Sequence, residues 1–176
     1  MAEPAAPGAS GAPRILLVSA DEDRHARDLI AAFGALGATV VLAGLSEIGF
    51  DTGSASGLRI PQFGDELPDA VCLRTMDAGS FEQVTRRLGV LHALARSGVP
   101  VSNGPRAVEN CVDKSMTSFL LHRAGLPSPR SYAVESRAEA ARILAAEPGP
   151  MVLKPLFGAQ GKGLKLICTA DDLPAA

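Results

Sequence analysis

The stretch Lys154-Pro-Leu-Phe-Gly-Ala-Gln-Gly-Lys-Gly163 lies between two short apolar runs near the end of the 176-residue chain. These runs, Met151–Lys154 and Leu164–Ile167, predict two strands joined by a glycine-rich loop. Glycine lets a backbone amide approach a ligand closely, and successive amides in such a loop form a concavity that binds anions. The two lysines add mobile positive charge. The loop is therefore typical of phosphate binding, with a solvated hairpin loop as the alternative.

This loop differs from the two most familiar phosphate-binding motifs. A Walker A loop places Ser or Thr directly after Gly-Lys at the start of a helix, whereas Gly163 follows Lys162 here. The Rossmann fingerprint Gly-x-Gly-x-x-Gly also turns into a helix, whereas the apolar run after Gly163 predicts a strand. The sequence therefore predicts a phosphate-binding loop carried by a hairpin.

The rest of the second half of the chain predicts alternating helices and strands. Helical spacing of apolar residues, Ser-x-x-Glu capping patterns and Pro/Gly stops define them. Since a sheet usually needs at least three strands to be stable, we expect this second unit to be incomplete. The expected elements are a helix over 106–124, a strand at Tyr132–Val134, a helix from Ser136 to about Ala146, and the start of a helix at Thr169.

The first half of the chain predicts a small open sheet with helices on its faces. Short apolar runs alternate with amphipathic segments, which indicates parallel strands joined by right-handed crossovers. The fold class expected is α/β, with a flexible tail at 1–13, a Rossmann-like domain at 14–105 and part of a second domain at 106–176. The expected strands are 14–18, 39–43, about 58–60, 69–73 and 99–101, and the helices are 24–36 and 80–97.

Composition and charge exclude several classes of function. The formal net charge is −2, which gives no electrostatic case for a nucleic-acid or anionic-membrane binder. No run approaches the 18 or so apolar residues of a transmembrane helix, and Met1–Pro13 lacks the features of a secretory signal. We expect a cytoplasmic protein.

The cysteines and histidines form no recognisable site. Cys72, Cys111 and Cys168 are far apart and odd in number, so we expect reduced, buried side chains. The three histidines are isolated from one another, which favours helix surfaces over a metal or catalytic site.

Two further segments hold candidate functional residues. Asp113-Lys114 lies inside the helix expected over 106–124, where such a pair is usually a solvated helix face. The segment Arg74–Ser80 follows a predicted parallel strand, and ligands of open α/β sheets gather at that edge. Arg74 is suited to bind a carboxylate or phosphate, with a surface loop arginine as the equal alternative.

Taken together, these segments resemble a known family, the RimK-type ATP-grasp proteins. The resemblance spans about Arg14 to Ile167, and includes the branch that adds L-glutamate to coenzymes, the tetrahydromethanopterin:glutamate ligases among them. The spacing from Asp-Lys to Val-x-Lys to the glycine-rich loop is its most specific feature. The motifs are Val112-Asp-Lys-Ser-Met-Thr-Ser-Phe-Leu-Leu-His-Arg-Ala-Gly-Leu-Pro-Ser-Pro-Arg130, Val152-Leu-Lys-Pro-Leu-Phe-Gly-Ala-Gln-Gly-Lys-Gly163, Arg74-Thr-Met-Asp-Ala-Gly-Ser-Phe-Glu-Gln83 and Asn103-Gly-Pro-Arg-Ala-Val-Glu109.

The resemblance implies a role for each matching residue. Lys114 would reach the ATP phosphates from its helix, and Lys154 would contact the α-phosphate and adenine region. Arg74 and Ser80 would bind substrate, and no catalytic residue is assigned. The loop that closes over the β- and γ-phosphates, excluding water from a reactive acyl-phosphate, would consist of Gly158, Gln160, Gly161, Lys162 and Gly163.

The implied reaction is ATP-dependent ligation of a carboxylate to an amine through an acyl-phosphate, with ATP and Mg²⁺ as cofactors. The substrates would be a small-molecule carboxylate and an amino acid. The family's Mg²⁺ ligands follow the loop and match no residue of this sequence, so we expect an N-terminal portion that is inactive alone. A homo-oligomer, a second chain supplying the missing half, and a non-catalytic nucleotide-binding or interaction module stay open as alternatives.

Overall fold

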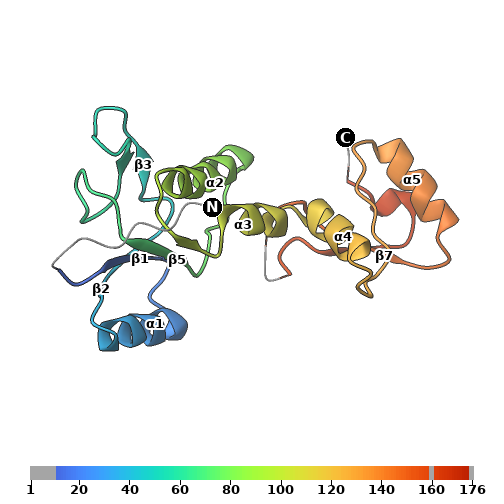
Figure 1. Ribbon diagram of the computed structural model, residues 1–176. Helices are drawn as coiled ribbons and strands as arrows, with labels where there is room; N and C mark the ends of the chain where they lie inside the picture. Colours follow the sequence, from blue (N-terminus) through green and yellow to red (C-terminus); the bar gives the residue numbers. More distant parts are fainter. Residues whose placement is uncertain (1–10, 159–160, 175–176) are drawn as a thin grey trace. The chain divides into compact units, whose positions relative to one another are not determined.

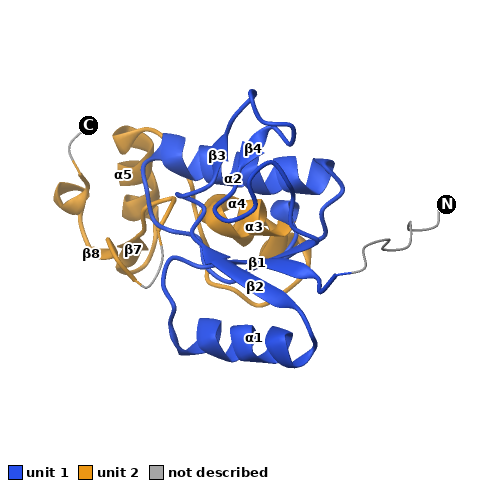
Figure 2. Cartoon of the chain, turned by 90° about the vertical axis from the view of Figure 1, so that its left-hand side faces the viewer, with its two compact units in different colours: residues 1–106 blue, residues 107–176 orange. Residues whose placement is uncertain are grey.

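The computed structural model describes residues 11–158 and 161–174. The chain divides into two compact units, residues 1–106 and residues 107–176 (Figure 2). Most of the tail expected at 1–13 therefore lies outside the described residues. The assignment of the two units to the two expected domains stays a prediction, and each unit is described separately below.

Unit 1 is built on a four-stranded parallel sheet, which confirms the predicted α/β class. Its strands are β1 (Arg14–Val18), β2 (Thr39–Ala43), β5 (Ala70–Leu73) and β6 (Val101–Ser102), in the order β2-β1-β5-β6. Strand β6 begins later than the predicted 99–101. Pro100 has no N–H to donate, and its carbonyl instead accepts from the Val71 amide at 2.8 Å.

The core of unit 1 lies on both faces of this sheet. Leu16, Leu17 and Val18 of β1 are fully buried, as a continuous apolar run in a parallel sheet predicts. Helices α1 (Arg24–Ala35) and α2 (Phe81–Arg96) lie on opposite sides of it (Figure 1). The two helices therefore cover both faces of the sheet (Figure 1).

Side-chain caps fix where these two helices begin. The Asp23 carboxylate accepts from the Ala26 amide at 2.8 Å and starts α1. At α2 the predicted capping box is confirmed: the Ser80 hydroxyl accepts from the Gln83 amide at 3.4 Å, and the Ser80 amide donates to the Gln83 side chain at 2.9 Å. Both caps belong to the loops at one edge of the sheet.

Residues 44–68 form a small antiparallel ribbon rather than an irregular loop. Strands β3 (Gly49–Phe50) and β4 (Leu58–Arg59) pair, and β4 confirms the short strand expected near 58–60. The ribbon is stabilised by buried apolar side chains that the sequence spacing did not reveal, namely Leu45, Ile48, Leu58, Ile60 and Phe63.

The prediction of a single helix over 106–124 is wrong, because Asp113 divides this segment into two helices. The structure has α3 (Pro105–Val112) and α4 (Lys114–Arg123). Asp113 adopts an extended conformation, and its carboxylate accepts from the amides of Ser115 at 2.8 Å and Met116 at 3.1 Å. The aspartate is thus the N-cap of a new helix, and Asp113-Lys114 is not a pair on a continuous helix face.

The remaining elements of unit 2 surround a small core. They are α5 (Arg137–Ala146), β7 (Met151–Leu153), β8 (Lys165–Ile167), antiparallel to β7, and a 3₁₀ turn η1 (Ala170–Asp172) in place of a longer helix. Leu144, Ile167 and Leu173 form the buried centre.

The strand predicted at Tyr132–Val134 is also wrong. This segment is irregular, and side-chain contacts hold it instead: the Tyr132 hydroxyl donates to Glu147, and Arg130 pairs with the same carboxylate at 3.1 Å. Because the hydroxyl serves as donor to Glu147, the pKa of Tyr132 is raised above its ordinary value.

The expectation about the cysteines is confirmed only in part. The cysteines are free, as predicted, but Cys111 and Cys168 are exposed and Cys72 is half-buried, so the prediction of buried side chains is wrong. Cys111 and Cys168 lie in unit 2, whose core is small.

None of the helices in the described part of the chain has the length and hydropathy needed to cross a membrane.

Candidate functional site

Lys114 connects the start of α4 to the glycine-rich loop. Its ammonium donates to the carbonyl oxygens of Leu156 at 3.1 Å and Gly158 at 2.7 Å, and its main-chain amide lies 3.4 Å from the Leu156 carbonyl. An ammonium has three N–H donors, so these two contacts leave one for a ligand. Residues 42 and 44 positions apart in the sequence are thus brought together.

The other two candidate lysines border the same loop. Lys154 directly follows β7 and is exposed, and Lys162 is exposed in the turn that precedes β8. Gln160 lies outside the described residues. With Lys114, these side chains place three positive charges on or beside one loop, which suits an anion with several oxygens.

Glycine is required at Gly163 for two reasons. Its φ of +75° lies in the left-handed region, and a Cβ added there would lie 3.2 Å from Pro155 Cγ. Gly158 and Gly161 also have positive φ values of 120° and 71°. The backbone of this loop therefore adopts a conformation that other residues would strain.

Two neighbouring charges are already engaged elsewhere. Hydrogen bonds from the Ser115 hydroxyl, and then from the Met116 and Ser115 amides, lower the pKa of Asp113 below its ordinary value. The Lys165 ammonium donates to the carbonyl oxygen of Asp172. Asp113 is thus an ionised helix cap, and Lys165 is directed to the 3₁₀ turn η1.

The described residues contain no group of three His, Cys, Asp or Glu side chains placed to hold a metal ion. Asp172 accepts from the amides of Cys168 at 2.8 Å and Thr169 at 3.0 Å, and these bonds lower its pKa. The exposed ammonium groups of Lys154 and Lys162 carry the positive charge that suits an anion at this loop.

Arg74 and Ser80 lie in unit 1, on the loop that follows β5. Arg74 forms an ion pair with Asp23 at 2.7 Å. The Ser80 hydroxyl caps α2 and also donates to Glu82 at 2.7 Å, which lowers the pKa of that carboxyl. Ser80 thus has a structural role in the described chain, and its assignment to substrate stays a prediction.

Sequence reasoning missed two residues of this edge, Asp23 and Arg87. Arg87 is only 6% exposed, and its Nη1 donates to the carbonyls of Asp77 at 2.8 Å and Ala78 at 3.0 Å. The signal was present, because Arg87 falls on the same helical stripe as the buried Val84 and Leu91. An arginine within an apolar stripe indicates a buried polar contact.

Comparison with known proteins gives a consistent set of relatives. No family model matches the chain. The tetrahydromethanopterin:alpha-L-glutamate ligase of Methanosarcina acetivorans is 45% identical over 96 residues, which are 54% of this chain and 29% of that ligase. The homologues of this chain are ATP-grasp ligases. The resemblance to RimK-type ATP-grasp proteins expected from the sequence is thus confirmed.

Solved ATP-grasp structures share the fold. The RimK domain ATP-grasp protein from Sphaerobacter thermophilus has a TM-score of 0.71 at 21% identity, over 90% of this chain and 55% of that one. The ATP-grasp ligase PsnB, solved with its precursor peptide PsnA2 and AMPPNP, has a TM-score of 0.54 at 26% identity, over 90% and 59%. The matched parts make up only 29%, 55% and 59% of these three proteins, so the chain spans less than two thirds of each.

Proposed function

We propose that this chain supplies nucleotide-binding residues of an ATP-dependent carboxylate–amine ligase. The proposed reaction adds an amino acid, L-glutamate, to a coenzyme or peptide carboxylate through an acyl-phosphate. The observation that carries the proposal is the contact of the Lys114 ammonium with the Leu156 and Gly158 carbonyls, which joins the Asp-Lys motif to the glycine-rich loop.

In this proposal the loop and its lysines act by positioning and charge neutralisation. Lys114 contacts the ATP phosphates, and Lys154 contacts the α-phosphate and the adenine region. The loop that covers the β- and γ-phosphates consists of Gly158, Gln160, Gly161, Lys162 and Gly163. A protein nucleophile is not needed, because the substrate carboxylate itself attacks the γ-phosphate and the amine then displaces phosphate.

Magnesium is part of the proposed reaction but is assigned to no residue here. PsnB has been solved with Mg and ADP. The described residues of this chain do not fit such an ion, because they gather no group of three potential ligands. The proposal therefore assigns the nucleotide, and not Mg²⁺, to the residues around the glycine-rich loop.

Calorimetry with the non-hydrolysable analogue AMPPNP tests nucleotide binding. We expect the double variant Lys154→Ala/Lys162→Ala to raise the Kd at least about tenfold, because each lost charge-assisted contact contributes about 1.5–3 kcal/mol. Lys165→Ala is the matched control, since Lys165 lies on the same hairpin but donates to Asp172. Equal affinities for the double variant and the control would contradict the proposed site.

The full-length gene product tests the reaction itself. We expect ADP release that depends on both an amino acid and a carboxylate acceptor. Nucleotide binding without such turnover would support the alternative, a non-catalytic nucleotide-binding module. Amine-independent ATP turnover would contradict the ligase proposal.

A further inference from the structure

The carboxyl edge of the unit 1 sheet has the topology of a ligand site. In the order β2-β1-β5-β6, the chain passes from β1 to β2 on one side, and the later strands lie on the other side of β1. The carboxyl ends of β1 and β5 therefore flank a topological switch point, where open α/β sheets bind ligands. Two loops meet there, residues 19–23 after β1 and residues 74–80 after β5.

Buried contacts fix the shape of the second loop. Arg87 holds the carbonyls of Asp77 and Ala78, and the Ser80–Gln83 capping box fixes its end. A Cβ on Gly79 would lie 2.6 Å from Gln83 Oε1 and 2.8 Å from Arg87 Nη1, so a side chain there would displace the two groups that make these hydrogen bonds. Such a loop can present a side chain in one defined position.

The two loops are also bonded to each other. The Thr75 hydroxyl lies 3.1 Å from the Ser19 hydroxyl and accepts from the Ala20 amide at 3.1 Å. Arg74 Nη2 donates to Asp23 at 2.7 Å. The edge is thus preorganised before any ligand arrives, which lowers the entropic cost of binding.

Arg74 borders a hollow at this edge. The hollow has a volume of about 550 Å³ and is lined by His25, Asp28, Leu29 and Arg74. This size falls within the range of about 300–1,000 Å³ typical of small-molecule sites. The Arg74 side chain is 27% exposed, and its Nε is buried without a hydrogen-bond acceptor among the described residues. The guanidinium has five N–H donors, so the ion pair with Asp23 does not exhaust it.

The charges around the hollow are mixed. Arg74 provides a cation, whereas Asp28 and Asp23 are acidic. A simple dianion would be repelled by these carboxylates. A molecule that carries a carboxylate and an ammonium group can place its carboxylate on Arg74 and its ammonium on Asp28. Asp28 also forms an exposed ion pair with Arg24, at 3.7 Å.

We propose that this hollow binds the free amino acid substrate, with Arg74 contacting its α-carboxylate and Asp28 its ammonium. Arg87 is a positioning residue that acts through the loop carrying Arg74. The identity of the ligand rests on the proposed ligase function, but binding to the hollow is measured without ATP.

Titration of the ¹⁵N-labelled chain by NMR tests this inference with L-glutamate as the probe. We expect saturable shifts of the amides of 19–29 and 74–78. Glutarate, which lacks the ammonium, is expected to bind at least about tenfold more weakly, because the contact with Asp28 is lost. Inorganic phosphate distinguishes a general anion site, since it would then bind more tightly than L-glutamate.

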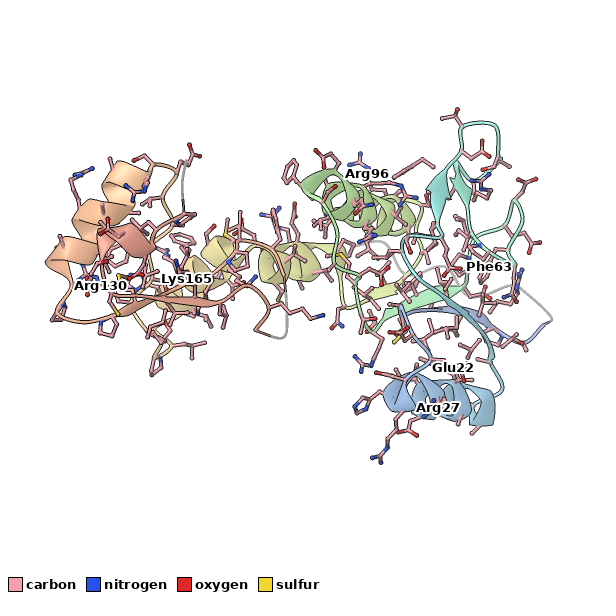
Figure 3. All side chains as sticks on the ribbon, turned by 180° about the vertical axis from the view of Figure 1, so that it is seen from behind. Glu22, Arg27, Phe63, Arg96, Arg130 and Lys165 are labelled. Carbon is pink, nitrogen blue, oxygen red and sulfur yellow. The ribbon has the colours of Figure 1, made fainter. Side chains whose placement is uncertain are left out.

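Variants assign the contacts. Arg74→Ala is expected to abolish the saturable shifts, and Arg74→Lys, which keeps the charge, to raise the Kd at least about tenfold because the planar fork is lost. Asp28→Asn should bring the affinity for L-glutamate down to that for glutarate. Arg27→Ala is the control: Arg27 lies on the same helix (Figure 3) and donates to the Glu22 carbonyl at 2.7 Å, outside the hollow lining.

Three outcomes would overturn the inference: shifts that do not saturate, shifts unchanged in folded Arg74→Lys and Asp28→Asn variants, or tighter binding of phosphate or glutarate. The spectrum of each variant itself shows whether it is folded. If AMPPNP binds and L-glutamate does not, only this inference fails. If L-glutamate binds and AMPPNP does not, the nucleotide site fails instead.

Discussion

At the scale of single residues, two neighbours in the chain have different tasks. Asp113 interrupts a helical stretch and caps α4, and Lys114 is then the first residue of that helix. This position directs the lysine toward Leu156 and Gly158, 42 and 44 residues away. The aspartate thus places the lysine, and the lysine contacts the loop.

Replacing Asp113 tests its role as a cap. We expect Asp113→Ala to lower the free energy of unfolding by about 1 kcal/mol at neutral pH, the usual value for an N-cap. The folded-state pKa of Asp113 lies below the ordinary 3.8, so the stabilisation is complete above that value. It is lost as the pH falls through the folded-state pKa. Urea unfolding at pH 7 and at about pH 2–3 measures the effect.

Ser136→Ala is the matched control for this experiment. Ser136 caps α5 in the same unit, accepting from the Glu139 amide at 3.1 Å, but does not titrate in this range. Ser136→Ala should therefore lower the free energy of unfolding by a similar amount at both pH values. A pH-independent cost for Asp113→Ala would contradict the electrostatic part of the cap.

At the scale of elements, the junction between β5 and α2 is tightly specified. The loop 74–80 is bonded to the loop after β1, and it also reaches the loop after β2 through Ser46 and Asp77, 3.2 Å apart. Arg87, on α2, donates to the Asp77 and Ala78 carbonyls of this loop. Three strand ends are therefore connected by one short segment.

Two glycines near this junction should respond in opposite ways to alanine. We expect Gly79→Ala to destabilise the protein by about 1–3 kcal/mol, because its Cβ would clash with Gln83 and Arg87. Gly89→Ala, within α2, would bring Cβ only to 3.6 Å from Phe50, an ordinary contact. It should be neutral or stabilise by up to about 1 kcal/mol, since alanine favours helices. Urea unfolding measures the change in the free energy of unfolding for both variants. Equal changes for Gly79→Ala and Gly89→Ala would contradict the expected clash at Gly79.

At the scale of the whole molecule, the two units differ in how well they bury apolar groups. In unit 1, β1 is paired on both sides, and its side chains from Leu16 to Val18 are fully buried. In unit 2, the paired residues Val152 and Leu166 of β7 and β8 are 51% and 61% exposed. A two-stranded sheet with exposed apolar side chains is expected to have low local stability.

Hydrogen exchange should show this difference. We expect the amides of β7 and β8 to exchange at least about a hundredfold faster than those of β1, because local opening exposes them at a lower free energy. Strand β2, at the edge of the larger sheet, provides an internal comparison and should be intermediate. Equal protection of β1 and β8 would contradict the expectation.

Much of unit 1 could be predicted from the sequence, because its elements are specified locally. The apolar run 14–18, the amphipathic residues 24–36 and the Ser80–Gln83 pair each define an element by themselves. The division of the 106–124 helix was missed because the stripe of apolar residues continues across Asp113, and only its backbone conformation shows the cap. The strand at Tyr132–Val134 was mispredicted because Tyr132 instead contacts Glu147, 15 residues away.

The sequence by itself determined the α/β class, the capping signals and the set of residues around the glycine-rich loop, because propensity, periodicity and motif spacing are local properties of a chain. Only the tertiary structure decided which of these residues meet. Lys114 donates to a carbonyl of the glycine-rich loop, and the buried Arg87 donates to a carbonyl of the loop 74–80. Arg74 pairs with Asp23. Such contacts join residues far apart in the sequence, and their geometry depends on how strands and helices pack rather than on any neighbouring residue.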